Sequence, residues 1–275
     1  MAGLRVGAVN YLNAKPLYYN LGDFAPGTFL CLDYPSNLAD RLARGELDVA
    51  LIPSVEYLRG AAFGYEILPG FAIAARGPVR SVKLFSNLPI ERIDRLALDA
   101  GSRTSQALAL VWLDQARGVR PGRVEPLPLG VPVEESTADA ALVIGDRAML
   151  VDESRFAAVV DLGAAWNTWT GLPFVFALWV ARPGVDLGDL PEVLERCRLE
   201  GLRNARVLAE EHAPRLGLNL ESCVDYLTRV LSYDLGPREI AGLRQFATRA
   251  ARQGLAPEGV ELVFHERRRH LAAGR

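Results

Sequence analysis

Apolar and polar positions form blocks along the chain that predict strands alternating with helices. Residues 6–9 are apolar and β-branched and predict a buried first strand, and 28–32 and 47–52 predict the next two. Between the last two strands, apolar positions recur at helical spacing, with Ser36 as the expected N-cap and Gly45 at the expected end. Strand, helix and strand joined by short connections are typical of a parallel sheet.

The pattern changes in the middle of the chain. Residues 66–75 predict one long strand and 81–85 another, which together resemble an antiparallel pair at a crossover between two lobes. A later apolar strand, 172–180, would run back to the first lobe. We therefore expect an α/β fold of two lobes: lobe 1 from residues 1–85 and 175–275, and lobe 2 from residues 86–174.

The remaining pattern is simpler. Short strands are expected near 96–98, 124–127, 140–144 and 159–162, with a helix from 102 to 118. From Leu187 onward the spacing is helical and predicts helices packed on a sheet face. Arg267, Arg268 and Arg269 are read as a solvated tail.

Composition favours a small-molecule partner. The 275 residues are half hydrophobic, and 31 Lys and Arg against 33 Asp and Glu leave a formal charge of −2, so no basic surface for nucleic acid or an anionic membrane is expected. No export signal or membrane-spanning run is visible, which predicts a cytoplasmic protein. Cys31, Cys197 and Cys223 have no metal-binding or disulfide spacing and are read as buried hydrophobic residues.

The first candidate site is the polar loop that follows the first strand. Asn10, Tyr11 and Asn13 would lie at the carboxyl edge of the sheet, where open α/β sheets bind ligands. Ser54 follows the third strand at the same edge. The alternative is that the Asn residues form a turn and that Ser54 caps a helix.

Ser86 and Asn87 follow the strand at the expected crossover, and would face the cleft between the lobes. The alternative is a simple turn before a helix at Ile90.

A second polar cluster, Ser102 to Ser105, stands at the start of a predicted helix, where backbone N–H groups and hydroxyls favour an anion such as a carboxylate. Ser102 alone would satisfy an N-cap, but Thr104 and Ser105 exceed what capping requires. Arg103 is either a counter-charge for the anion or a solvated side chain.

Two further segments are weaker candidates. Gly145 permits close approach of the backbone to a ligand, while Asp146 and Arg147 are either site residues or an ion pair that caps a helix. Trp169 and Phe174 are either a pocket wall or packing at the hinge.

Residues and motifs that the expected cleft lacks limit the kinds of reaction that this chain could catalyse. His212, His265 and His270 all lie in the last quarter of the chain, which disfavours a histidine base, a serine triad or a His-rich metal site. No phosphate-binding or dinucleotide-binding glycine motif is present. A site here would act through amides, hydroxyls and helix ends.

Four segments together resemble a known family. They are residues 6–17 (VGAVNYLNAKPL), 102–105 (SRTS), 141–148 (ALVIGDRA) and 166–179 (WNTWTGLPFVFALW), and their order resembles that of the chorismate dehydratases of the futalosine route to menaquinone. The resemblance implies a two-lobed fold like the type II periplasmic binding proteins, with mixed sheets flanked by helices and a cleft between the lobes. It also implies conversion of chorismate to 3-[(1-carboxyvinyl)oxy]benzoate and water, with no cofactor and no metal.

By match to the family motifs, Asn13 and Ser86 are expected to be catalytic, and Thr104 with Ser105 to bind substrate. The mechanism we expect is substrate-assisted: the enolpyruvyl carboxylate removes the proton, while Asn13 and Ser86 orient it or the departing hydroxyl. Two alternatives remain: the sister enzyme that makes dihydroxynaphthoate, which the resemblance implies uses a histidine in its cleft, and a receptor for an aromatic or dicarboxylate ligand. The sequence gives no oligomeric state.

Overall fold

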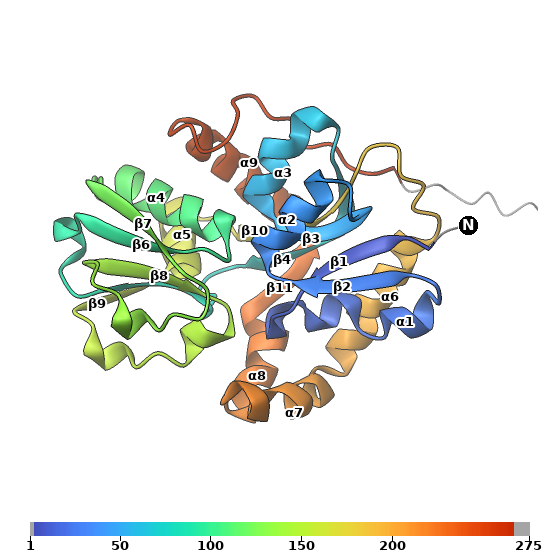
Figure 1. Ribbon diagram of the computed structural model, residues 1–275, viewed down its shortest axis with the longest axis horizontal. Coiled ribbons are helices and arrows are strands. Elements are labelled where there is room, and N and C mark those ends of the chain that lie inside the picture. The colour runs from blue at the N-terminus through green and yellow to red at the C-terminus, as the bar shows by residue number, and fades with distance from the viewer. Residues whose placement is uncertain (1–2, 267–275) are drawn as a thin grey trace, which may run out of the picture.

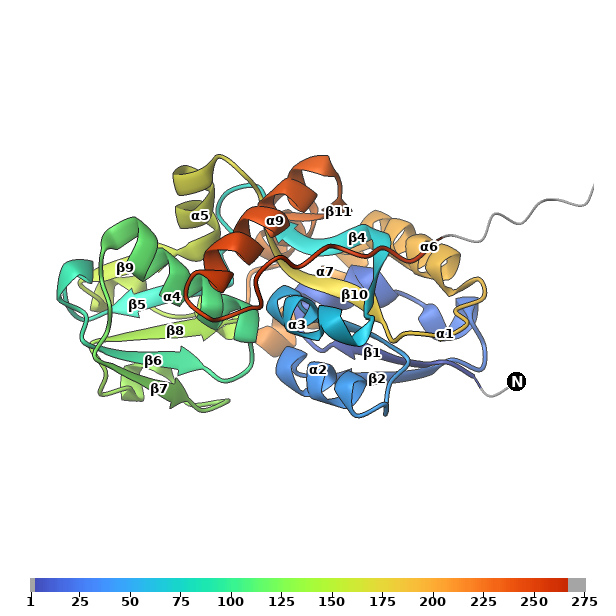
Figure 2. The same ribbon diagram turned by 90° about the horizontal axis from the view of Figure 1, so that it is seen from above.

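The computed structural model describes residues 3–266, which form two lobes, each built on its own sheet (Figures 1 and 2). The first sheet has the strand order β11-β4-β10-β3-β1-β2 and the second β7-β6-β8-β5-β9. The strands of the first sheet are β1 (Arg5–Val9), β2 (Phe29–Asp33), β3 (Val49–Pro53), β4 (Glu66–Ala75), β10 (Phe174–Ala181) and β11 (Leu231–Leu235).

In the first sheet, β1 lies between β2 and β3 and pairs in parallel with both, as the strand-helix-strand pattern predicts. The strands β10, β4 and β11 then extend the sheet in antiparallel pairs. The sequence pattern does not predict β11, because the spacing of apolar residues is helical from Leu187 onward. It has five residues, and its alternation of buried Leu231, Tyr233 and Leu235 is too short to distinguish from helical spacing.

Helices cover both faces of the first sheet (Figure 1): α2, α3 and α9 lie above it, and α1 and α6 to α8 lie below it. Ser36 does not cap α2, because the helix begins at Pro35 and Tyr34 takes the N-cap position. The elements are η1 (Leu12–Tyr18), α1 (Leu21–Phe24), α2 (Pro35–Ala43), α3 (Ser54–Gly60), η2 (Ala61–Phe63), α6 (Leu190–Arg203), α7 (Ala205–Leu216), α8 (Leu220–Asp225), η7 (Tyr226–Val230) and α9 (Pro237–Ala251).

The second lobe contains residues between the two crossovers. The helices α4 and α5 cover one face of its sheet, and short 3-10 turns cover a separate apolar cluster on the other. Its elements are β5 (Val82–Ser86), η3 (Ile90–Arg92), β6 (Arg95–Asp99), α4 (Arg103–Arg117), β7 (Arg123–Leu127), η4 (Val133–Glu135), β8 (Ala140–Ile144), η5 (Asp146–Met149), η6 (Glu153–Arg155), β9 (Ala158–Asp161) and α5 (Leu162–Thr170).

The expected lobe boundary at 85/86 is wrong by one strand. The strands β4 and β5 do not pair; β5 instead lies between β8 and β9 in the second sheet, so the chain crosses between lobes at 76–81. The positive φ of Arg80, 63°, lies in this crossover and turns the chain away from β4. The chain returns at 171–173 and enters β10 in the first sheet, as predicted.

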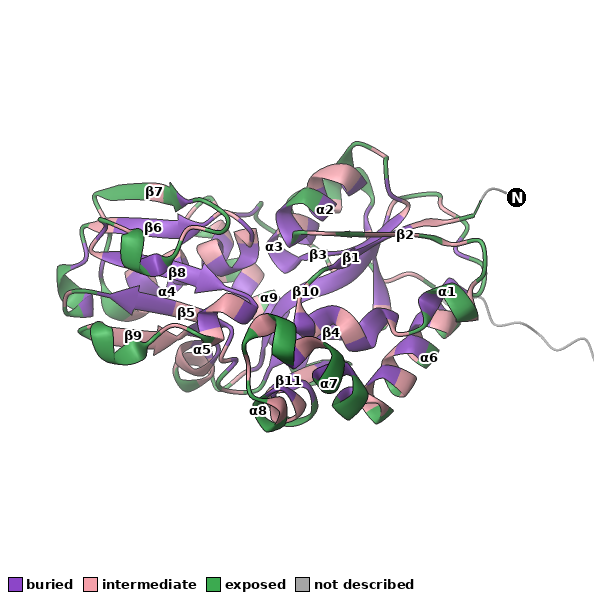
Figure 3. Cartoon of the chain, turned by 60° about the horizontal axis from the view of Figure 1, so that its bottom comes forward, coloured by how far each residue is buried: buried purple, intermediate pink, exposed green. Residues whose placement is uncertain are grey.

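The central strands of both sheets are buried, whereas the edge strands β2, β7 and β9 are partly exposed, and exposed residues also gather on the outer faces of the helices (Figure 3). Cys197 and Cys223 are buried as predicted, whereas Cys31 is only half-buried. Within residues 3–266, no helix is long and apolar enough to span a bilayer.

An aromatic cluster closes the return crossover. The ring of Phe174 lies 5.2 Å from Trp166, 4.7 Å from Phe176 and 4.9 Å from Phe246, in edge-to-face arrangements. Trp169 packs edge-on against Trp166, and the guanidinium of Arg249 lies 3.8 Å from its ring centre. These contacts make Trp169 and Phe174 packing residues at the hinge.

Replacing Phe174 by Leu should therefore lower the free energy of unfolding by about 1.5 kcal/mol, because the ring contacts are lost and a small cavity remains. Urea denaturation measures the change. The same replacement at Phe63, whose side chain is 74 % exposed, should leave stability nearly unchanged. Equal effects at the two positions would contradict this packing role.

Candidate active site between the lobes

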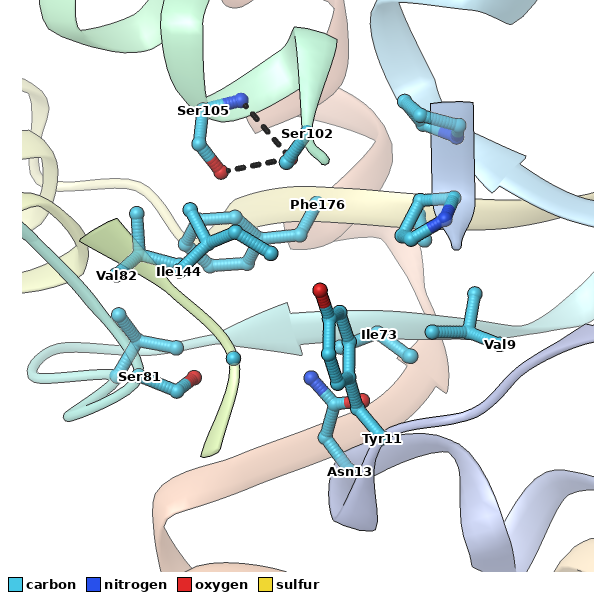
Figure 4. Close-up of a pocket in the computed structure, with 15 residues that line it drawn as sticks. Val9, Tyr11, Asn13, Ile73, Ser81, Val82, Ser102, Ser105, Ile144 and Phe176 are labelled. Atoms are coloured by element: carbon cyan, nitrogen blue, oxygen red, sulfur yellow. Dashed lines mark hydrogen bonds between the residues drawn. The ribbon is translucent and has the colours of Figure 1, made fainter. Parts of the chain in front are cut away.

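A cavity lies where the carboxyl ends of strands from both lobes meet. Strand ends from the first lobe, the crossover at 79–82 and the start of α4 surround it (Figure 4). Its polar lining residues are Tyr11, Asn13, Ser81, Ser102 and Ser105. The apolar ones are Val9, Pro35, Pro53, Ile73, Val79, Val82, Ile144, Phe176 and Ala177, with Gly145 between them.

Among the described residues, the lining includes no Asp, Glu, Lys, Arg or His. The apolar part of the wall suits a ring, and the neutral polar groups suit hydrogen bonds to oxygen. Anywhere within residues 3–266, no cluster of three or more His, Cys, Asp or Glu residues could bind a metal ion. The arrangement fits a small, mainly apolar molecule with a few oxygen-bearing groups.

Asn13 lies at the start of η1, and its Oδ1 atom is buried with no hydrogen-bond partner. A buried amide oxygen without a partner costs free energy, so the group is arranged for a partner that the protein itself does not supply. Figure 4 shows the amide nitrogen on the side of Ser81. The Asn13 Oδ1 atom is therefore an acceptor available to a ligand, and the amide nitrogen has two N–H groups, of which an interaction with Tyr226 can use one.

The start of α4 forms the opposite wall. Ser102 is the N-cap, as predicted, and its Oγ accepts from the Ser105 backbone N–H at 3.4 Å. The two hydroxyls are hydrogen-bonded to each other at 2.9 Å, which leaves one hydroxyl proton for a ligand in the cavity. Because the first N–H groups of a helix have no intrahelical acceptor and the dipole is positive there, this wall favours a carboxylate.

Gly145 brings the backbone close to Tyr11. Its φ is 76°, and a Cβ atom there would lie 2.9 Å from the Tyr11 ring. Its N–H donates to the Ser81 carbonyl at 2.8 Å, which fixes the crossover against the end of β8. Both the positive φ and the lack of room for a Cβ atom require glycine at this position.

Ser86 and Asn87 do not line the cavity, which contradicts the prediction that they face the cleft. Val82 pairs with Ile144 beside the cavity and Ser86 pairs with Ala140, so β5 carries Ser86 about 13 Å away from it. The Ser86 hydroxyl donates to the Leu88 carbonyl at 2.6 Å and forms the turn that was the alternative reading. Ser81, at the other end of the strand, is the serine that reaches the cavity.

Three more predicted site residues connect the lobes instead of lining the cavity. Arg103 pairs with Asp40 of α2 and with Glu56 of α3, so it is neither a counter-charge in the cavity nor a solvated side chain. Thr104 accepts from the Val55 backbone N–H at 3.1 Å. Ser54 donates to the Val175 carbonyl at 2.7 Å, and its hydroxyl lies 3.4 Å from that of Thr104.

A second pocket, the outer groove, shares Tyr11 with the cavity. Asn10 and Asp146 line it together with Arg147. Lys15 donates to the Asn10 side chain at 3.0 Å, and Arg147 pairs with Asp99 instead of with Asp146. Neither Asn10 nor Asp146 contributes to the inner cavity.

Asp146 instead joins the lobes through the backbone of η1. Its carboxylate accepts from the Leu12 N–H at 3.2 and 3.3 Å. Burial raises the pKa of the Asp146 carboxyl to about 6, although the Leu12 N–H and the charge of Lys15 act in the opposite direction. The ionised form of Asp146 is therefore costly in the folded protein.

This raised pKa predicts a pH-dependent stability difference. A carboxyl with a higher pKa folded than unfolded stabilises the fold at low pH, and that contribution is lost as the pH rises from about 4 to 6. Asp146→Asn, which retains an acceptor for Leu12, should raise the free energy of unfolding by about 2 kcal/mol at pH 8 and hardly at all at pH 4. Urea denaturation of both proteins at the two pH values measures this, and a difference independent of pH would contradict it.

The fold and the site define a class. The structure resembles the periplasmic aliphatic sulphonate binding protein of Escherichia coli with a TM-score of 0.64 at 16 % identity, covering 97 % of this chain and 94 % of that one. This is the two-lobed fold of periplasmic solute-binding proteins.

Sequence comparison then gives the family. Residues 4–252 match the family model described as menaquinone biosynthesis, and the chain belongs to that family. It is 34 % identical to the chorismate dehydratase of Thermus thermophilus, over 88 % of this chain and 93 % of that protein. It is 26 % identical to the chorismate dehydratase of Campylobacter jejuni (87 % and 94 %) and 24 % identical to the 1,4-dihydroxy-6-naphtoate synthase of Streptomyces coelicolor (84 % and 84 %).

Proposed function

We propose that this protein is a chorismate dehydratase of menaquinone biosynthesis, a hydro-lyase that converts chorismate to 3-[(1-carboxyvinyl)oxy]benzoate and water. The observation that carries the proposal is the cavity between the lobes, with an unpartnered Asn13 amide on one wall and the start of α4 on the other. The names of the two most similar relatives described above support it.

The substrate has the features that this cavity could recognise. Chorismate is a small ring with two carboxylates and a hydroxyl, and the cavity offers an apolar wall, neutral hydrogen-bonding groups and one helix N-terminus. We propose that the N-terminus of α4 with Ser102 and Ser105 holds one carboxylate. Tyr11 and Gly145 would then close the wall beside the ring.

The reaction breaks two bonds that join ring carbons to their substituents, one C–H bond and one C–O bond. A proton leaves the carbon that bears the enolpyruvyl ether, the electron pair of that C–H bond forms the new ring double bond, and hydroxide leaves the adjacent carbon. The proton and the hydroxide together make the water that is lost, and aromatisation supplies the driving force.

No described residue lining the cavity is an obvious base, which supports a substrate-assisted proton removal. In this scheme the enolpyruvyl carboxylate of the substrate takes the proton, and the amide nitrogen of Asn13 donates a hydrogen bond to that carboxylate. The unpartnered Oδ1 atom can accept from the carboxylic acid once it holds the proton. Ser81, not Ser86, would donate a hydrogen bond to the same carboxylate or to the departing hydroxyl. Asn13 and Ser81 lie on neighbouring parts of the cavity wall in Figure 4.

The direct test is to incubate the purified protein with chorismate and to separate the products by liquid chromatography. We expect 3-[(1-carboxyvinyl)oxy]benzoate to accumulate with many turnovers per protein molecule. A stoichiometric thermal shift with chorismate, without product, would instead indicate a receptor.

The menaquinone route also supports a cytoplasmic location, which cell fractionation would test.

The sister reaction is the second candidate. Its support is the more distant match to the 1,4-dihydroxy-6-naphtoate synthase. Neither His212 nor His265 lines the cavity, and His265 lies 2.6 Å from Glu66 at the far side of the first lobe. His270 and the basic run at 267–269 lie outside the described residues. A cavity wall without histidine favours the dehydratase.

A further inference from the structure

Tyr226 lies directly behind the cavity wall. Its side chain is completely buried, and its hydroxyl donates to the Ser81 Oγ at 2.6 Å, across 145 positions of the sequence. It does not line the cavity itself. The contact joins the C-terminal part of the first lobe to the crossover that carries Ser81.

The backbone around Tyr226 is unusual. Residues Tyr226–Val230 form η7, a π-helical turn between α8 and β11, and this turn packs against η1, which carries Asn13. Such turns are rare and occur frequently at functional sites, because the wider turn redirects side chains. Here the turn places the Tyr226 phenol behind Asn13 and Ser81, the two polar side chains that the proposed function uses.

The numbers of donors and acceptors on the Ser81 hydroxyl show what the contact with Tyr226 does. A serine hydroxyl has one proton to donate and two lone pairs. Because Tyr226 donates to one lone pair, the Ser81 proton is free for another acceptor, and the open side of Ser81 is the cavity. Without the phenol, the hydroxyl could rotate and donate to backbone oxygens instead.

The protonation state of the Tyr226 phenol is also fixed. Burial raises the pKa of the Tyr226 hydroxyl well above its usual value, although hydrogen bonds with Ser81 and with Asn13 act in the opposite direction. Tyr226 is therefore neutral and able to donate throughout the physiological pH range. The Asn13 amide lies close enough to take part in the same small network.

We infer that Tyr226 is a positioning residue, which holds the Ser81 hydroxyl as a hydrogen-bond donor directed into the cavity. This inference rests on the proposed function, in which Ser81 touches the substrate. Tyr226 itself acts only through Ser81 and through the Asn13 amide beside it.

The test is the Tyr226→Phe variant, which keeps the ring and removes only the hydroxyl. We expect kcat for chorismate to fall about 10-fold, the value of one hydrogen bond, with KM changed less than 2-fold. Tyr233→Phe is the matched control, because the Tyr233 hydroxyl is equally buried, has no partner among the described residues and does not line the cavity. We expect Tyr233→Phe to keep the wild-type kcat.

A double-mutant cycle separates positioning from a structural role. If Tyr226 acts through Ser81, then Ser81→Ala and the double variant Ser81→Ala with Tyr226→Phe should turn over at nearly the same rate. A further 10-fold loss in the double variant, or an unchanged kcat in Tyr226→Phe, would overturn the inference.

A crystal structure of Tyr226→Phe provides a readout that does not depend on the reaction. The Ser81 side chain should occupy a different or a mixed rotamer in the variant, and an unchanged single rotamer would count against the inference. If the wild-type protein does not dehydrate chorismate, the proposed function fails, and this rotamer comparison still decides whether Tyr226 positions Ser81.

Discussion

Asn13→Ala should lower kcat for chorismate by about 100-fold to 1000-fold and change KM by only a few-fold. In the proposed reaction the Asn13 amide holds the carboxylate that takes the proton, and this contact matters most when charge shifts in the transition state. Loss of one preorganised donor of this type typically has an effect of that size. The variant should fold, because the Oδ1 atom that it removes has no partner within the protein. Steady-state kinetics and calorimetric titration with chorismate measure the two quantities separately.

Asn10→Ala is the comparison within the same loop. Asn10 is exposed, lies outside the inner cavity and accepts from Lys15, so its loss should reduce kcat far less than the loss of Asn13. Equal effects of the two replacements would show that the loop matters only as a whole. An Asn13→Ala variant with wild-type kcat would remove Asn13 from the reaction.

Ser102→Asp should raise KM for chorismate by roughly 100-fold while leaving the protein folded. Aspartate is as good an N-cap as serine, so α4 retains its start. Its carboxylate, however, would stand where a carboxylate of the substrate is proposed to bind. Two like charges about 5 Å apart at an effective dielectric constant of 20 repel by about 3 kcal/mol, which corresponds to the stated change.

Ser102→Asn is the matched control, since it caps the helix equally well and adds no charge. Its KM should rise no more than about 10-fold. If both variants weaken binding equally, shape and not charge sets the effect. If Ser102→Asp binds chorismate as tightly as the wild type, the start of α4 does not hold the carboxylate. Thermal unfolding of both variants checks that the helix is intact.

Local patterns predicted most of the elements because they encode burial directly. The apolar runs at 66–75 and 140–144 and the hydroxyl that caps α4 can all be recognised within a few residues. The parallel order of β1 to β3 also follows from short connections. The loop at Asn13 and the start of α4 are thus both recognisable in the sequence, although their proximity is not.

Pairings between distant segments could not be predicted in this way. Whether Ser81 or Ser86 reaches the cavity depends on which sheet receives β5 and in which direction it runs, and the sequence pattern of the strand is the same in either case. Ser81 directly precedes β5 and Ser86 ends it, so the two serines stand at opposite ends of one strand and only the direction of that strand in the sheet decides between them.

The contacts between the lobes explain the other misplaced residues. Arg103, Thr104 and Asp146 have the chemistry of ligand-binding groups, but each is used by a partner more than 45 positions away in the sequence. Asp40, the Val55 N–H and the Leu12 N–H carry no local signal of this pairing. Charged and polar groups that hold two lobes together therefore look, in the sequence alone, like part of the site itself.

The most direct measurement is a crystal structure of the Asn13→Ala variant with chorismate bound. The account predicts the ring inside the cavity, one carboxylate at the Ser102 and Ser105 end of α4, and the enolpyruvyl group beside Ser81 and the position of the missing amide. Chorismate in the outer groove lined by Asn10 and Arg147, with the inner cavity left without it, would contradict the account.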